Sequence, residues 1–199
     1  MKIGILGTGE VGNLLGSRLI ENGHQVMMGG REAKNQIGLA FVNKHSSKNA
    51  SYGTFAEASR FGEIVLNATN GRFALNALKL ANTDFAGQLI IDVANPLDFT
   101  KKPAILIPEL ANTNSLGESI QHNFPKAKVV KTLNTLGMAL AVNPKQLNDG
   151  QHSLFICGND EGAKTRAKTL LTEFGWKIDN IIDLGDITGA RAMEGFLIL

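Results

Sequence analysis

The chain opens with Met1-Lys-Ile-Gly-Ile-Leu-Gly7-Thr-Gly9-Glu-Val-Gly12. The apolar residues 3–6 are typical of a buried strand, and a helical pattern begins at Glu10. Glycines at this spacing between a strand and a helix form a dinucleotide-binding fingerprint. We expect Gly7 to permit a tight turn, Gly9 to let a pyrophosphate approach the backbone, and Gly12 to let the helix lie close to the strand. The pyrophosphate would then meet the helix N-terminus.

Strands and helices alternate through the rest of the chain. Strands are predicted over residues 3–6, 25–28, 50–52, 63–67, 88–93, 127–133, 153–157 and 176–184. Helices are predicted over residues 10–22, 33–43, 72–81, 115–123 and 160–174, from residue 54, and from about residue 186 to the C-terminus. This order predicts an α/β fold of the Rossmann type, with a doubly wound, mostly parallel sheet and helices on both faces. We expect one domain over residues 1–199.

The segment after the second strand indicates which nicotinamide cofactor is bound. Enzymes that use NAD usually place an acidic residue there, where it holds the ribose 2′-hydroxyl. In this chain Gly29 and Gly30 follow the strand, and Arg31 and Lys34 come next. A guanidinium can bind a phosphate through two parallel hydrogen bonds, and a lysine adds a point charge. Arg31 and Lys34 therefore favour NADP, whose 2′-phosphate they would bind, although a solvated arginine in a loop remains the alternative.

Three further strand ends carry small or amide-bearing residues. They are Ala68-Thr69-Asn70, Ala94-Asn95-Pro96 and Asn134-Thr135-Leu136-Gly137. In open α/β sheets, ligands bind beyond the carboxyl ends of the strands, where the strand order reverses. Such residues suit packing and hydrogen bonding around a flat nicotinamide with its carboxamide. Each segment is equally compatible with an ordinary strand-to-helix turn, because turns favour these residue types.

The composition excludes several classes of protein. The chain has 199 residues, 43% of them hydrophobic, so a sizeable core is expected rather than disorder. The net charge of +2 is spread out, and no basic stripe predicts a nucleic-acid partner. No apolar run is long enough to span a bilayer, and the first strand begins at the N-terminus, so neither a membrane segment nor a signal peptide is expected. The single cysteine, Cys157, suits a reducing compartment and is expected to be a buried, inert thiol. We expect a cytoplasmic protein.

No residue pattern identifies a catalytic acid, a nucleophile or a metal site. The four histidines are expected at the surface, in loops or on polar helix faces: His24, His45, His122 and His152. Reduction of a carbonyl normally requires a proton donor near the developing alkoxide. Passing a hydride between two stacked conjugated rings requires less of the protein, because the cofactors supply the electronics. The sequence therefore favours ring-to-ring transfer with no assigned catalytic residue.

Five segments in this order resemble a known family. They are the glycine-rich turn, Gly30-Arg31, Asp92-Val-Ala-Asn-Pro96, Lys131-Thr-Leu-Asn134-Thr, and Gly185-Asp-Ile-x-x-Ala-Arg191-x-x-Glu194. Together they resemble the NADPH-dependent reductases of the deazaflavin coenzyme F-420, which are similar to the cytosolic part of six-transmembrane metalloreductases. The resemblance implies a deazaflavin stacked near the nicotinamide. It also implies that Thr8, Gly9, Glu10 and Val11 cradle the pyrophosphate, and that Gly30, Arg31 and Lys34 hold the 2′-phosphate.

Three functions therefore stay open at the level of the sequence. The leading hypothesis is an oxidoreductase that moves a hydride between NADPH and a deazaflavin or flavin-like acceptor, working as a homodimer. The second is a reductase of a small imine or carbonyl, although such enzymes usually add a long helical domain, and the chain after Gly137 is too short and too rich in strands for one. The third is a module that binds NADP(H) as a redox sensor without turnover.

Overall fold

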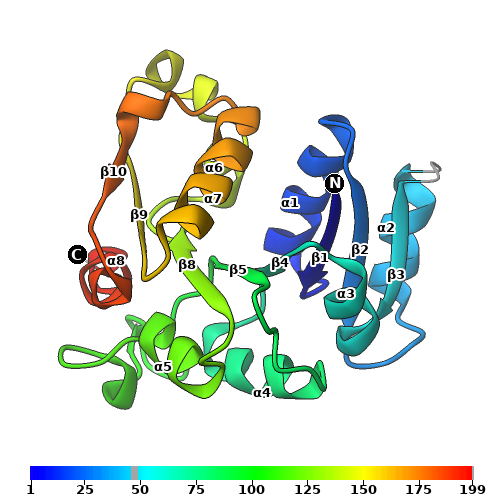
Figure 1. Cartoon of the computed structure of the whole chain (residues 1–199), viewed down its shortest axis with the longest axis horizontal. Helices are drawn as coiled ribbons and strands as arrows, with labels where there is room; N and C mark the ends of the chain where they lie inside the picture. The colour runs from blue at the N-terminus through cyan, green and yellow to red at the C-terminus, as the bar shows by residue number, and fades with distance from the viewer. Residues whose placement is uncertain (46–48, 199) are drawn as a thin grey trace.

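A computed structural model of the chain describes residues 1–45 and 49–198. Its main sheet has eight strands in the order β10-β9-β8-β5-β4-β1-β2-β3 (Figure 1). Neighbouring strands are parallel except β8 and β9, which pair antiparallel. The strands of the sheet and of a small hairpin (β6 and β7) are β1 Lys2–Leu6, β2 Gln25–Gly30, β3 Ala50–Thr54, β4 Ile64–Asn67, β5 Leu89–Asp92, β6 Leu97–Asp98, β7 Ile105–Leu106, β8 Lys128–Thr132, β9 Leu154–Gly158 and β10 Ile181–Asp183. The predicted Rossmann-type, mostly parallel sheet is thus confirmed.

Helices cover both faces of this sheet. They are α1 Glu10–Glu21, α2 Gln36–His45, α3 Phe55–Phe61, α4 Ala74–Leu80, α5 Leu116–Asn123, α6 Met138–Ala141, α7 Glu161–Phe174 and α8 Ala190–Phe196. Short 3-10 turns lie at Gly71–Phe73, Pro108–Leu110, Pro144–Gln146, Asn148–Gly150, Ile178–Asn180 and Ile187–Gly189.

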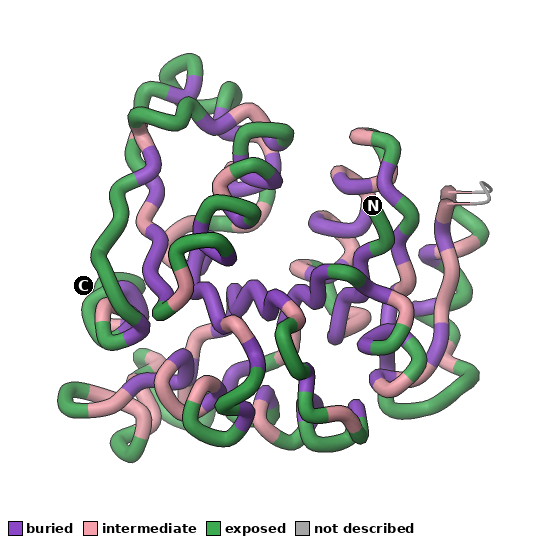
Figure 2. Tube along the Cα trace, in the orientation of Figure 1, coloured by how far each residue is buried: buried purple, intermediate pink, exposed green. Residues whose placement is uncertain are grey.

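The alternation of side chains along the strands divides the core into two layers. One layer packs β-strand residues such as Ile3 and Ile5 against α1, α2 and α7. The other packs residues such as Leu6 and Val65 against α3, α4, α5 and α8. Figure 2 shows the central strands as almost continuously buried, as expected for a parallel sheet covered on both sides.

Several element boundaries differ from the sequence prediction: the strand predicted over residues 176–184 is limited to β10, and the helices predicted from residues 72 and 186 begin with 3-10 turns before α4 and α8. Two further differences frame the loop after β2. The helix predicted from Ala33 begins at Gln36, because the Asn35 side chain accepts hydrogen bonds from the N–H groups of Ile37 and Gly38 and so caps the helix there. The second strand runs on to Gly30, where its backbone pairs with Thr54 of β3. The loop that carries Arg31 and Lys34 therefore lies between the end of a strand and a capped helix.

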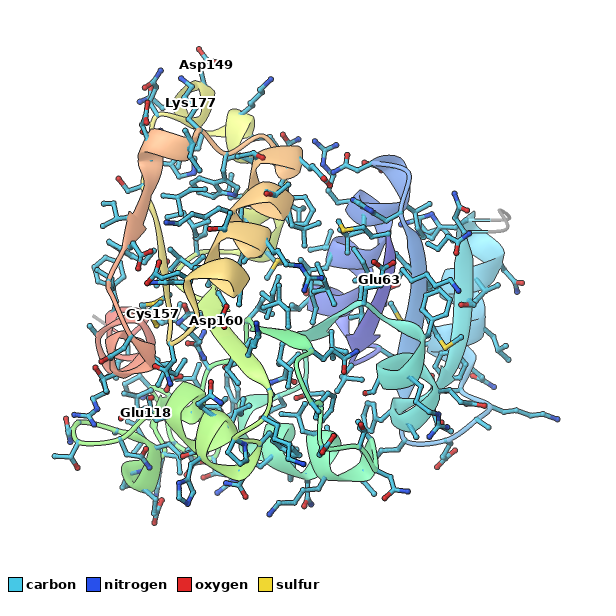
Figure 3. All side chains as sticks on the ribbon, viewed as in Figure 1. Glu63, Glu118, Asp149, Cys157, Asp160 and Lys177 are labelled. Atoms are coloured by element: carbon cyan, nitrogen blue, oxygen red, sulfur yellow. The ribbon has the colours of Figure 1, made fainter. Side chains whose placement is uncertain are left out.

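The prediction that all four histidines lie at the surface is wrong for His24. The residue is 6% exposed, and its Nε2 lies 2.5 Å from the Glu173 carboxylate of α7. This pair joins the turn between α1 and β2 to α7, which is remote in sequence. Burial of Cys157 is confirmed: it lies on β9 beside α8 (Figure 3), and burial raises the pKa of its thiol to about 12.

A buried ion cluster joins the second half of the sheet to the C-terminal helix. The Lys131 ammonium of β8 lies 2.7 Å from Asp92 at the end of β5 and 2.7 Å from Glu194 of α8. It also donates to the carbonyl of Ala94. Burial alone would lower the pKa of Lys131, but the carboxylates of Asp92 and Glu194 outweigh it and raise the pKa. All three side chains are essentially inaccessible to water, so each charge depends on its partners.

We expect Lys131→Met to lower the free energy of unfolding by about 3–5 kcal/mol, because it leaves two carboxylates in the core without their cation. Urea unfolding followed by circular dichroism measures the loss. Lys168→Met is the matched control: its ion pair with Asp183 is partly exposed, so the change should stay below about 1 kcal/mol. Similar losses in both variants would contradict a special role for the buried cluster.

Candidate functional site

A groove crosses the carboxyl ends of β1 and β4, the neighbouring strands at which the strand order reverses. Two cavities form it: a larger one of about 550 Å³ and a smaller one of about 280 Å³. They share the lining residues Gly9, Ala68, Thr69 and Asn70, so they are two ends of one groove. Ligands in open α/β sheets bind at this position.

The glycine-rich turn forms the floor between the two ends. Gly7 has a φ of +123°, which side-chain-bearing residues rarely adopt, and a Cβ at Gly12 would lie 2.2 Å from the Gly7 carbonyl oxygen. At Gly9, in contrast, no heavy atom lies within 4 Å of where a Cβ would stand. Gly9 caps α1 without a side-chain hydrogen bond, so no capping side chain occupies the N–H groups of the first turn. This cradle fits an anionic group such as a pyrophosphate.

Two of the three predicted phosphate-binding residues, Gly30 and Arg31, line one end of the groove. Arg31 lines the larger cavity together with Glu32 and Asn35, whereas Lys34 is exposed and is not part of the lining. The Tyr52 hydroxyl donates to the Glu32 carbonyl at 2.6 Å and so holds this loop to β3. Burial raises the pKa of the Tyr52 phenol, which keeps it protonated as a donor.

The side chain of Tyr52 lies against two glycines, Gly30 and Gly38. A Cβ at Gly30 would lie 2.4 Å from the Tyr52 Oη, and a Cβ at Gly38 of α2 would lie 2.1 Å from a ring carbon. The tyrosine therefore occupies the space that two side chains would need. It packs β3 against the start of α2 and positions the loop that carries Arg31.

The smaller cavity lies on the other side of β1. Glu10 and Val11 of α1 line it, together with Asn95 after β5 and Leu97 and Phe99 of the hairpin. The predicted residues Pro96, Asn134 and Thr135 do not line either cavity.

Asn134 lies behind Asn95 and holds it in place. Its Nδ2 donates to the Asn95 Oδ1 at 2.9 Å and to the Met193 carbonyl of α8 at 3.0 Å. The Asn95 Nδ2 donates in return to the Asn134 carbonyl at 2.8 Å. The two asparagines therefore position each other, and only Asn95 reaches the groove.

Sequence reasoning missed the apolar lining of the groove. Phe55 of α3, Phe73 of the 3-10 turn Gly71–Phe73 and Leu80 of α4 line the larger cavity, and Phe99 lines the smaller one. Phe73 is 59% and Phe99 65% exposed, which is unusual for phenylalanine and provides flat apolar surface for a ring. Their local sequence carries no signal, because only the fold brings these positions to the groove.

Few groups in the groove can exchange a proton. Glu10 is the titratable side chain that lines the smaller cavity, and Arg31 and Glu32 are those that line the larger one. Among the described residues no histidine, cysteine, tyrosine or lysine lines either cavity, and no three potential ligands gather as they would around a metal ion. Nor does any helix in the described ranges have the length and apolar character needed to cross a bilayer. The groove thus combines a glycine turn without side chains, which fits an anionic group, with flat apolar surface beside it.

Comparison with known proteins identifies similar chains. The family model for "NADP oxidoreductase coenzyme F420-dependent" matches residues 2–96. A crystal structure from Arthrobacter sp. FB24, of a protein assigned as an F420-dependent NADP reductase, is 42% identical, with a TM-score of 0.91 over 100% of this chain and 90% of that one. A reductive aminase from Aspergillus terreus in complex with NADPH is 15% identical, with a TM-score of 0.66 over 99% of this chain and 59% of the other, which shows the shared fold.

Curated relatives are longer than this chain. The metalloreductase STEAP3 of Rattus norvegicus is 27% identical over 97% of this chain but only 36% of its own length. The chain thus spans about a third of the curated relatives that it matches.

We expect Gly30→Ser to lower the free energy of unfolding by about 1–3 kcal/mol, since its Cβ would overlap the Tyr52 Oη. Adding Tyr52→Phe to this variant should recover most of the loss, because the oxygen that clashes is removed. Gly9→Ser, at a position with open space, is the control and should unfold like the unaltered chain. The measurement is chemical unfolding without cofactor; no recovery in the double variant would show that Tyr52 is not the obstacle.

Proposed function

The chain belongs to the family of coenzyme F420-dependent NADP oxidoreductases, and on that premise we propose that it transfers a hydride between NADPH and a planar ring acceptor, either a deazaflavin or a flavin. NADP is accordingly its cofactor, and oxidoreduction is its class of reaction. The choice of a ring acceptor rests on the smaller cavity. The exposed side chain of Phe99 forms an aromatic wall there, and few of the lining groups could donate a proton.

The cofactor would lie along the groove in one direction. The turn over Gly7–Gly12 would hold the pyrophosphate, and Arg31, with Lys34 nearby in sequence, would bind the 2′-phosphate. The larger cavity offers Phe55, Phe73 and Leu80 as apolar walls for the adenine ring. The nicotinamide would then extend into the smaller cavity.

The smaller cavity supports transfer between rings. When bound, NADPH supplies a hydride from its nicotinamide ring, and the acceptor takes up that hydride together with a proton from solvent. Val11 and Ala94 leave space for one flat ring, and the exposed Phe99 offers an apolar face for a second. The protein's part is to hold two rings face to face and to exclude water from between them.

We expect Arg31→Ala to weaken the binding of NADPH far more than that of NADH, by about 1.5–3 kcal/mol, because a charge-assisted contact to the 2′-phosphate is lost. Titration of each dinucleotide measures the ratio of the two dissociation constants. Arg166→Ala removes an exposed arginine of α7 that does not line the groove and should leave the ratio unchanged. Equal weakening of NADPH and NADH by Arg31→Ala would contradict the assignment.

The acceptor is tested by following NADPH oxidation with coenzyme F-420 and, separately, with FMN, FAD and riboflavin. We expect rapid oxidation with at least one of these rings. Preference for F-420 supports the deazaflavin, and preference for a flavin keeps the mechanism with a different acceptor. Tight NADPH binding without oxidation by any ring would overturn ring-to-ring transfer in favour of a small imine or carbonyl substrate, or of a sensor.

Three expectations from the sequence stay predictions. They are the homodimer, the cytoplasmic location and the treatment of residues 1–199 as one domain.

A further inference from the structure

Thr69 lies at the junction of the two cavities and lines both. Its hydroxyl donates to the Asn67 Oδ1 at 2.7 Å. A hydroxyl has one hydrogen and two lone pairs. Because the hydrogen is committed to Asn67, the Thr69 oxygen can offer only lone pairs to whatever occupies the groove.

The orientation of the Asn67 amide is fixed from both sides. Its Nδ2 donates to the Asp92 Oδ1 at 2.7 Å. On the other side, the backbone N–H of Thr69, which can only donate, points at the Asn67 Oδ1 at 3.4 Å. A flipped amide would bring its N–H₂ group against the Thr69 N–H and its oxygen against the Asp92 carboxylate. Asn67 is completely buried, so water does not compensate either clash.

The ion cluster in turn fixes Asp92 as an acceptor. The Lys131 ammonium, which has no lone pair, lies 2.7 Å from the Asp92 Oδ2. The N–H of Ala94 lies 3.3 Å from the Asp92 Oδ1, so both oxygens face donors. Glu194 secures the other side of Lys131, and its own oxygens accept from the N–H groups of Leu116 and Gly117 at 2.8 and 3.1 Å. The donors therefore converge on Asp92: Lys131 donates to it from one side and Asn67 from the other, and Thr69 donates to Asn67.

We propose that this buried chain makes Thr69 a hydrogen-bond acceptor that selects the N–H₂ group of the nicotinamide carboxamide. The inference rests on the proposed binding of NADPH and adds a selecting atom to it. A pyrophosphate has no hydrogen to give and would be repelled by the Thr69 lone pairs, so this residue suits the nicotinamide end of the cofactor. Asn67, Asp92 and Lys131 act as positioning residues, since none of them lines the groove.

The test compares NADP⁺ with its 3-acetylpyridine analogue, in which a methyl group replaces the carboxamide N–H₂. Isothermal titration measures both dissociation constants without turnover. We expect the unaltered protein to bind the analogue roughly three- to tenfold more weakly, the effect of one lost hydrogen bond. In Thr69→Val the two dissociation constants should become equal. In Thr69→Ser, which keeps the hydroxyl, NADP⁺ should still bind more tightly than the analogue.

Asn67→Ala tests the positioning role. The Thr69 hydroxyl could then turn and donate to the carbonyl oxygen that both dinucleotides carry, so the preference for NADP⁺ should shrink while both still bind. A purely structural role for Asn67 would weaken the two ligands in parallel.

Equal affinity of the unaltered protein for the two dinucleotides would overturn the inference. So would a Thr69→Val variant that weakens the binding of both dinucleotides equally, because the donor to Thr69 would then be a group that both carry, such as a ribose hydroxyl. Tight NADP⁺ binding in these cases leaves the proposed function intact. Failure to bind NADP⁺ at all would contradict the proposed function itself.

Discussion

The structure depends on the Lys131 ammonium group, which is placed in the core between two halves of the chain. Lys131 is surrounded by protein, and a charge in such a place is tolerated only when its partners are held at bonding distance. Asp92 and Glu194 meet that requirement from the end of β5 and from α8, and the N-terminus of α5 satisfies the second carboxylate. The cluster therefore fixes how the second half of the sheet, α5 and α8 fit together. A shift of any one of them would leave a charge unpaired.

The same cluster reaches the groove through its neighbours. Lys131 bonds the Ala94 carbonyl beside Asn95, and Asp92 bonds Asn67 beside Thr69. Met193, next to Glu194 in α8, holds Asn134, which holds Asn95. Asp92, Lys131, Asn134 and Glu194 thus lie together in a buried network. They position their neighbours Ala94 and Asn95, which line the smaller cavity.

The two ends of the groove rely on different physical effects. At the glycine-rich turn, the absence of side chains and the free N–H groups of α1 provide a site for negative charge. At the smaller cavity, apolar groups determine the shape and amide groups offer hydrogen bonds, and almost none of the lining groups can exchange a proton. This division suits a reaction whose electronics reside in the bound rings, and it leaves orientation as the protein's main contribution.

The sequence by itself determined the fold class and the glycine-rich turn, because both depend on local patterns: apolar runs of strand length and glycines at a fixed spacing. It also placed Arg31 after β2, since that position follows from counting along one strand–helix–strand unit. Only the tertiary structure decided that Asn134 supports Asn95 from behind, that Tyr52 fills the space beside Gly30, and that His24 is buried against α7. Each of these depends on contacts between segments far apart in the chain. The same holds for the direction of the Thr69 hydroxyl. It depends, through Asn67 and Asp92, on Lys131, which lies 62 positions away in sequence. The charge of Lys131 has no partner until the sheet has formed.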